Sequence, residues 1–323
     1  MTHTVQPLSV IRAASGMLFA SVLWTLAMPL NGWGQTPGGD VDQAALSSLG
    51  GRSTAAIVEI DFTDSQQIND ETIKSLSPLR RDLRRLTLAN TPITDEGVYW
   101  LREFSELTHL DLSGTQVTNA SLEYVGELTS LRYLSLSKSK ITGGGAIDLI
   151  GLRQLETLDL SETHVDDDTV RDLRALPRLR TLSLRGCLAI DNCVRGFPDF
   201  PELRSLDLSG IKLQSMAGFN GAEWSKTRLE SLKLNNTQVS KSLFSEIYDF
   251  RYLRELGVAN TQITSEELLG FVQFRHQFPA FAALEKLYVG QHLPTRQPQL
   301  HSDEVRTKIL EAYPKVEIIT VEP

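Results

Sequence analysis

Hydrophobic residues recur along the chain in one fixed pattern. The stretch "LTHLDLSGTQVT", residues 107–118, has leucine at its first, fourth and sixth places, threonine at its ninth and valine at its eleventh. Most successive copies of this frame are 24 residues apart, and a weaker first copy begins at Ile57. The other copies begin at Leu83, Leu107, Leu131, Leu155, Leu179, Leu203, Leu229, Leu253 and Leu284. The pattern predicts one domain built from about ten repeats.

Each repeat contains the signals for a strand, a turn and a helix. Leu110 and Leu112 alternate with polar residues, as in a strand with one face in the core. Thr115 is expected to turn inward and to bond turn backbone with its hydroxyl. Helix N-cap residue types come next in many copies: Asn69 and Asp70, Thr94 and Asp95, Thr118 and Asn119, Asp166 and Asp167, Asp191 and Asn192, and Thr264 and Ser265. One strand and one short helix per repeat predict a curved α/β solenoid with a parallel concave sheet and convex helices.

The repeats resemble leucine-rich repeats. "LRRLTLANTPITDEGV" and the cysteine-bearing "LRTLSLRGCLAIDN" are similar to the cysteine-containing subtype found in F-box substrate receptors and in exported bacterial proteins, notably those of planctomycetes. The resemblance covers residues 42–323 and implies a leucine-rich-repeat horseshoe. By the same likeness, residues 42–56 are expected to form an N-terminal cap, residues 57–301 the repeats, and residues 302–323 a C-terminal cap.

The N-terminal residues follow a different pattern. Arg12 precedes an apolar run over residues 13–30, and Gly32 and Gly34 supply small residues suited to a signal peptidase. We therefore expect residues 1–34 to be a signal peptide and residues 35–41 a short spacer. The run of about 18 residues is also long enough for an uncleaved membrane anchor. The predicted location is the periplasm, the cell surface or the medium, with membrane contact only if the segment stays attached.

Charge and composition narrow the choice of partner. The formal net charge is −8 and the sequence pI is about 5.4, which argues against nucleic acid as the partner. The one basic run, residues 80–85, is interpreted as a solvated edge of the first full repeat. An F-box-like ubiquitin-ligase substrate receptor remains an alternative, although the 22 residues between Gly34 and Ile57 are too few for a helical adaptor domain.

No arrangement of residues predicts catalysis, a metal site or a cofactor. His164 stands near Asp166, Asp167 and Asp168, but the repeat frame makes these aspartates a helix start, where negative charge is favourable. Cys187 replaces the threonine or serine at the ninth place, where an inward-facing free thiol fits the frame. A disulfide with Cys193, six residues later, is the alternative. The sequence predicts a protein that is not an enzyme.

The predicted function is that of a non-catalytic, exported protein-binding scaffold that uses its concave surface. The fifth place of each repeat points into the concave space, where aspartates recur in alternate copies. A solvated face without a partner, and a structural component of the cell envelope, are the alternatives. The expected partner is a protein or an envelope polymer, and oligomeric state is left open. The candidate binding residues are Asp61, Asp111, Asp159, Asp207, Tyr133, Arg185, Lys233 and Tyr288.

Overall fold

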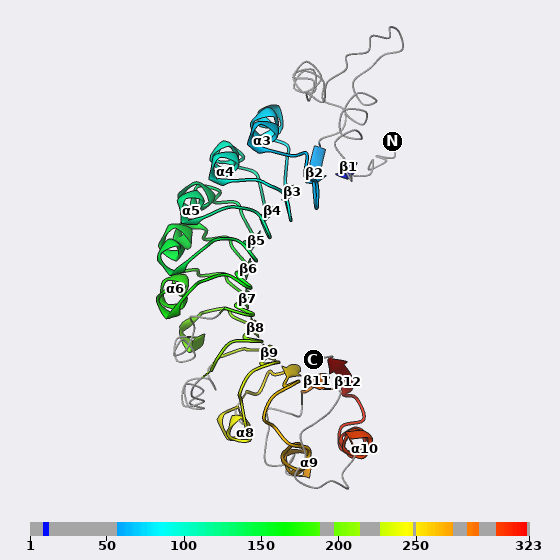
Figure 1. Ribbon diagram of the computed structural model, residues 1–323. Helices are drawn as coiled ribbons and strands as arrows, with labels where there is room; N and C mark the ends of the chain where they lie inside the picture. Colours follow the sequence, from blue (N-terminus) through cyan, green and yellow to red (C-terminus); the bar gives the residue numbers. More distant parts are fainter. Residues whose placement is uncertain are drawn as a thin grey trace, which may run out of the picture. The chain divides into compact units, whose positions relative to one another are not determined.

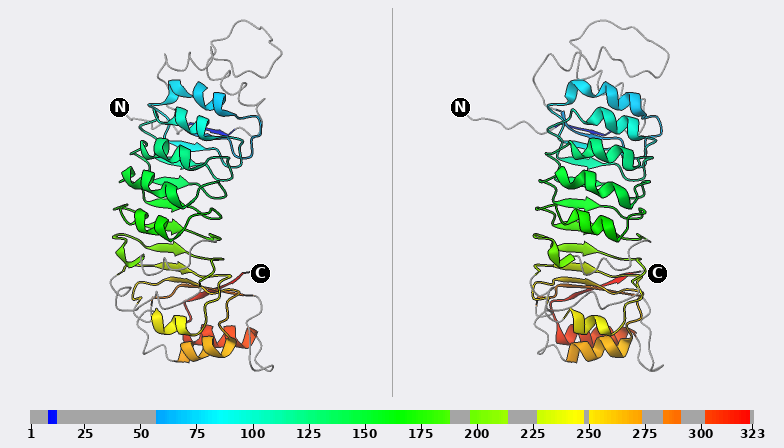
Figure 2. Two further views of the ribbon diagram at one scale, coloured as in Figure 1. Left: turned by 60° about the vertical axis from the view of Figure 1, so that its left-hand side comes forward. Right: turned by 90° about the vertical axis from the view of Figure 1, so that its left-hand side faces the viewer.

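A computed structural model describes seven segments of the chain, and their residues fall into two compact units. Unit 1 is Met1–Leu155 and unit 2 is Glu156–Pro323. In each unit the described helices lie on one side of the strands (Figures 1 and 2). The described segments are residues 9–12, 57–187, 197–213, 227–247, 250–273, 283–290 and 302–321.

In unit 1, neighbouring strands pair in parallel and in chain order. The strands are β1 (Ser9–Arg12), β2 (Ile57–Asp61), β3 (Arg85–Thr87), β4 (His109–Asp111) and β5 (Tyr133–Ser135). The helical segments are α3 (Asp70–Ser75), η1 (Ser77–Leu79), α4 (Asp95–Leu101), η2 (Asn119–Ser121), α5 (Leu122–Gly126) and η3 (Gly143–Gly151). The predicted order of strand, turn and helix is confirmed for these copies.

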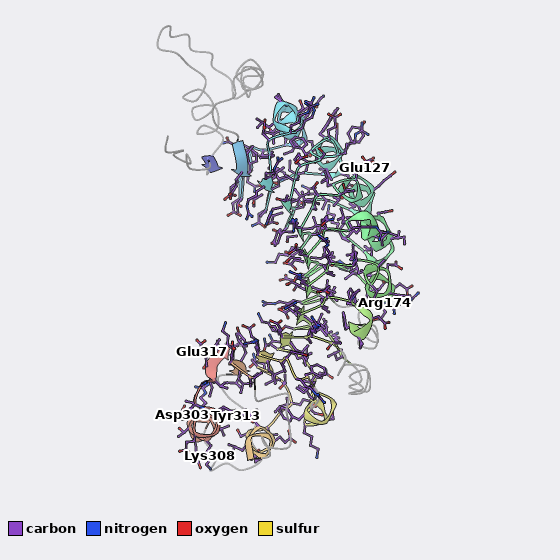
Figure 3. All side chains as sticks on the ribbon, turned by 180° about the vertical axis from the view of Figure 1, so that it is seen from behind. Glu127, Arg174, Asp303, Lys308, Tyr313 and Glu317 are labelled. Carbon is purple, nitrogen blue, oxygen red and sulfur yellow. The ribbon has the colours of Figure 1, made fainter. Side chains whose placement is uncertain are left out.

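Unit 2 repeats the same construction. Its strands are β6 (Thr157–Asp159), β7 (Thr181–Ser183), β8 (Ser205–Asp207), β9 (Ser231–Lys233), β10 (Glu255–Gly257), β11 (Lys286–Gly290) and β12 (Glu317–Val321). Its helices are α6 (Asp167–Leu173), α8 (Ser242–Glu246), α9 (Ser265–Gln273) and α10 (Ser302–Ala312). Figure 3 labels Asp303 and Lys308 on α10 and Glu317 at the start of β12.

The leucine frame forms the core of each unit. Leu86, Leu110 and Leu134 are aligned on three successive strands of unit 1, and each is at most 1% exposed. A fully buried leucine contributes roughly 1.5–3 kcal/mol to folding. Because each repeat stacks only on its neighbours, this column of leucines is what joins one repeat to the next.

The ninth place of the repeat holds the turn together, as predicted. In unit 1 the hydroxyls of Thr91, Thr115 and Ser139 each donate a 2.6 Å hydrogen bond to the carbonyl three residues earlier. Thr163, Thr237 and Thr261 make the same bond in unit 2, at 2.6–2.8 Å. These side chains are buried, so the bonds satisfy carbonyl groups that water does not reach.

The eighth place has left-handed backbone. Gly114 has a φ of +65°, and a Cβ there would lie 2.2 Å from Oδ1 of Asn90, so a side chain would add a collision to the backbone strain. Asparagine takes the same place in several copies, which fits its tolerance of this conformation. Within the described segments, the residues with positive φ are Asp64, Asn90, Gly114, Lys138, Glu162, Gly186, Gly210, Asn236 and Asn260.

Consecutive helix starts in unit 1 are joined by side-chain clamps. The carboxylate of Asp95, the first residue of α4, accepts hydrogen bonds from both the amide and the hydroxyl of Thr118 in the next repeat, each at 2.7 Å. Asp70 holds Thr94 in the same way. Asn119 accepts the amide of Thr142 and donates to its hydroxyl. The predicted N-cap residues therefore also connect one repeat to the next.

The structure describes only four residues of the predicted signal peptide. Ser9–Arg12, within the predicted signal peptide, is strand β1 and pairs in parallel with β2. The rest of the predicted signal, the spacer and the N-terminal cap lie outside the described residues, so the cleavage site stays a prediction. Among the described residues, no helix has both the length and the apolar character needed to cross a membrane.

Candidate functional site

The strands determine which side chains face away from the helices. In each three-residue strand the middle leucine is buried, and the residues before and after it form the side of the sheet opposite the helices, termed here the sheet side. Seven of the eight candidate residues stand on strands at these two positions. Arg185 instead lies two residues beyond the end of β7 and is exposed. Asp61, Asp111 and Tyr133 are in unit 1, and the other five candidates are in unit 2.

The candidate aspartates have a structural role as well as a charge. The carboxylate of Asp111 accepts a 2.9 Å hydrogen bond from the backbone amide of Ser113, two residues later. Asp61, Asp159 and Asp207 make the same bond at 2.9–3.0 Å. All four side chains are half-buried rather than fully exposed. Each carboxylate thus fixes the turn after its own strand, and those of Asp61 and Asp159 also accept the hydroxyls of Thr63 and Ser161.

The sheet side of unit 1 carries a row of paired side chains. Arg85 forms an ion pair with Glu59 on the neighbouring strand at 3.6 Å. The His109 and Tyr133 rings are stacked, with centroids 5.9 Å apart and planes 18° apart. His109 Nδ1 also lies 2.9 Å from the Thr108 hydroxyl. Four successive strands, β2 to β5, therefore present acid, base, imidazole and phenol in a line.

Unit 2 pairs two candidates that are far apart in sequence. Nζ of Lys233 on β9 lies 5.4 Å from the centre of the Tyr288 ring on β11. The strand between them offers Gly257 at the same register position, so no side chain separates the two. The sequence singled out both residues, but it did not predict this contact.

A second charged group stands beside this pair. Glu255 accepts hydrogen bonds from the Lys286 ammonium and the Ser231 hydroxyl, each at 3.1 Å. Burial is the largest influence and raises the pKa of Glu255, but the two hydrogen bonds and the positive charges of Lys286 and Lys233 together hold the pKa below its ordinary value. The same contact raises the pKa of Lys286. Glu255 and Lys286 therefore stay charged and paired near neutral pH.

The other candidate chemistry has structural explanations. Asp166 is the N-cap of α6 and forms a capping box with Thr169, while Asp168 contacts Arg171. His164 is exposed nearby. Among the described residues, no group of three or more His, Cys, Asp or Glu side chains is placed to hold a metal ion.

Cys187 is a buried free thiol whose Sγ lies 3.2 Å from the Leu160 carbonyl oxygen. The predicted free, inward-facing thiol is confirmed, and Cys193 lies outside the described residues. Burial raises the pKa of the Cys187 thiol, although contacts with Thr163 act in the opposite direction. The neutral thiol is therefore held inside the turn, where it replaces the hydroxyl of the other repeats.

We expect Cys187 to resist alkylation in the folded chain, because the reactive thiolate is scarce and the sulfur is buried. In a Cys193→Ser variant, in which only Cys187 can react, iodoacetamide at pH 8.5 should modify the folded chain about 100-fold more slowly than the urea-unfolded chain. The rates are measured by mass spectrometry. Similar rates in the two states would contradict the buried position of the thiol.

Comparisons with known proteins agree with this geometry. A family model described as leucine rich repeat matches residues 105–165, within which strands recur at the 24-residue interval. The fold is a leucine-rich-repeat solenoid. The predicted fold class is therefore confirmed, whereas the cysteine-containing subtype stays a prediction. No curated protein matches the chain by sequence.

Several solved leucine-rich-repeat structures are similar in fold. An internalin (inlF) from Listeria monocytogenes has a TM-score of 0.56 and 20% identity, with 86% of this chain and 76% of that chain covered. The mouse RP105/MD-1 complex has a TM-score of 0.54 and 19% identity, with 83% of this chain and 43% of that chain covered. The TLR13–ssRNA13 complex has a TM-score of 0.52 and 20% identity, with 79% of this chain and 35% of that chain covered. The chain thus spans less than half of the second and third of these proteins.

Proposed function

We propose that this leucine-rich-repeat protein is a non-catalytic binding scaffold whose partner, a protein, docks on the sheet side. The observation that carries the proposal is that several half-buried side chains on the sheet side are already held in place by contacts with one another. Examples are the His109–Tyr133 stack and the Lys233–Tyr288 pair. Side chains ordered before binding lose less conformational freedom when a partner arrives.

The similar structures support a binding role and leave two classes of partner. RP105 is seen in complex with the protein MD-1, whereas TLR13 is seen with single-stranded RNA. The net charge of −8 favours a protein here, because RNA binding requires a basic face to offset the phosphates.

Export is part of the proposal. It rests on the predicted signal in residues 1–34, which gives a periplasmic, cell-surface or secreted protein, or a membrane-attached one if the segment is retained. A structural envelope component is the second candidate function. It would associate with copies of itself rather than with a separate partner.

The test is capture of envelope and culture-fluid proteins of the source organism on the immobilised full chain. A sheet-side variant combines Asp111→Asn, Tyr133→Ala, Arg185→Ala and Asp207→Asn. Asparagine keeps the oxygen that accepts the turn amide, so the fold is expected to persist. The control variant changes exposed helix-side residues: Arg102→Ala, Glu123→Gln and Glu127→Gln. Figure 3 shows Glu127 beside the helices of unit 1.

Wild type and the helix-side variant should capture the same protein, and the sheet-side variant should capture at least about tenfold less, as expected when several residues that contact a partner are removed. Equal capture by both variants would contradict docking on the sheet side. Recovery of only the chain itself would favour the structural component, and preferential recovery of RNA would contradict a protein partner.

A further inference from the structure

The fifth place of the repeat changes character within unit 2. In register order from β6 to β8 it holds Asp159, Ser183 and Asp207. From β9 to β11 it holds Lys233, Gly257 and Tyr288. An acidic stretch of the sheet side is therefore followed, one strand later, by a cationic and aromatic stretch.

Lys233 has no acidic partner within 4.0 Å among the described residues, although two acids stand on the adjacent strands. Asp207 accepts the amide of Ser209, and Glu255 is occupied by Lys286 and Ser231. Lys233 instead extends across Gly257 to the Tyr288 ring. A Cβ at position 257 would lie 2.8 Å from the Asn235 side chain, so the tight packing there favours glycine and keeps the lysine's path open.

This arrangement gives an ordered cation that makes no ion pair within 4.0 Å among the described residues, although its charge also helps to lower the pKa of Glu255 on the neighbouring strand. Contact with an aromatic face holds the ammonium in place and leaves its positive charge intact. A lysine that is already ordered loses less side-chain entropy when an anion binds. The flat Tyr288 ring beside it adds apolar contact area of the kind that often dominates protein interfaces.

We propose that the Lys233–Tyr288 pair is a docking site for an acidic side chain on an extended segment of a protein partner. The inference rests on the proposed function, because it names the chemistry that one part of the sheet side recognises. A single free ammonium suits a carboxylate. Lys286, the neighbouring cation, is committed to Glu255, so a phosphate group would lack the several donors that it usually engages.

The acidic stretch from Asp159 to Asp207 favours a basic residue elsewhere on the same segment of the partner. Asp159 and Lys233 are separated by three strand spacings, about 14 Å. Four residues of extended chain span about 13 Å. A segment with a basic residue four positions from an acidic residue would therefore match both ends of this surface, whereas an entirely acidic segment would be repelled by Asp159 and Asp207.

The test is NMR titration of the full chain, with tyrosine and lysine side chains labelled, using the peptide Ac-Lys-Gly-Ser-Gly-Glu-NH₂. The matched peptide Ac-Lys-Gly-Ser-Gly-Gln-NH₂ lacks only the carboxylate. Lys233→Gln removes the ammonium, Tyr288→Leu removes the ring, and Lys212→Gln is the control at an exposed lysine elsewhere in unit 2. Backbone amide spectra verify that each variant is folded.

The glutamate peptide should shift the Tyr288 resonances saturably, and Lys233→Gln should weaken its binding about fivefold, the upper range for an exposed ion pair. Tyr288→Leu should also weaken it, and Lys212→Gln should not. Four results would contradict the docking site. They are equal binding of the two peptides, no binding of either peptide, an equal loss of affinity in both lysine variants, and displacement of the glutamate peptide by single-stranded RNA. If the peptide titration fails but the sheet-side variant still captures less partner than wild type, only this inference is contradicted. If the sheet-side variant captures as much partner as wild type, the proposed function itself is contradicted.

Discussion

Deletion of residues 107–130, one complete repeat, is expected to leave unit 1 folded, whereas deletion of residues 107–118, half a repeat, is expected to abolish its cooperative unfolding. The complete deletion replaces each contact by one of the same type. The Arg84 carbonyl accepts the amides of Thr108 and His109, and the Thr108 carbonyl accepts those of Arg132 and Tyr133. After the complete deletion, Arg132 and Tyr133 would meet the Arg84 carbonyl.

The helix starts also match after the complete deletion. Thr142 occupies the place of Thr118 in its repeat and would meet the Asp95 carboxylate. After the half deletion, the residues that reach β3 come from a turn and a short helix, so the buried leucine column is interrupted and polar groups enter the core. Burying such groups without partners costs roughly 1–3 kcal/mol each.

Hydrogen exchange in peptides covering residues 83–101 reports on unit 1 directly, and circular dichroism melts report on the whole chain. Retained protection in the complete deletion and lost protection in the half deletion are the expected results. Equal loss of protection in both variants would contradict the nearest-neighbour construction of the unit.

Asp95→Ala is expected to lower the free energy of unfolding by about 3 kcal/mol. The substitution removes two 2.7 Å hydrogen bonds from Thr118 and the negative charge in the first turn of α4. Hydrogen bonds to a charged group contribute roughly 1.5–3 kcal/mol each, and a charge at a helix N-terminus contributes roughly 0.3–1 kcal/mol when exposed. Because Asp95 is partly exposed, the expected loss is smaller than the sum of these contributions.

The chain itself supplies the matched control for this prediction. Asn119 holds Thr142 by accepting its amide and donating to its hydroxyl. Asp95→Asn should therefore preserve the clamp and cost less than about 1 kcal/mol, mainly from the lost charge. Urea unfolding at constant m-value measures both variants. Equal losses for alanine and asparagine would show that the charge rather than the clamp stabilises this junction.

The repeat elements were predictable because their causes are local. Leu110, Thr115 and Thr118 predicted a strand, a buried turn and a helix start from residues within one repeat, and each is confirmed. The glycine run at residues 143–145 indicates a loosened helix start, but the nine-residue 3-10 form of η3 was not predicted. Three glycines weaken helical preference there, and a Cβ at Gly145 would lie 2.5 Å from Leu122, so close packing against the preceding repeat determines its shape.

The candidate site was predictable only as a set of positions. The frame placed Lys233 and Tyr288 on the same side of the sheet, but their contact depends on Gly257 and on the alignment of β10 with β11 across a 31-residue repeat. The clamp between Asp95 and Thr118 likewise joins two repeats. The pairing of β1 with β2 joins segments more than 40 residues apart. Contacts of this kind depend on three-dimensional register, which a pattern read within one repeat does not contain.

The 24-residue interval between paired strands bears on how fast this protein folds. Parallel sheets usually form slowly, because their partners are distant in sequence and a long loop must close before any contact is gained. Here each of the strands β3 to β5 is separated from its predecessor by a single repeat, so closing the loop costs about the same entropy at every step. Rates within unit 1 should therefore resemble those of proteins rich in local contacts, and adding further repeats of the same length should leave the barrier to each step nearly unchanged.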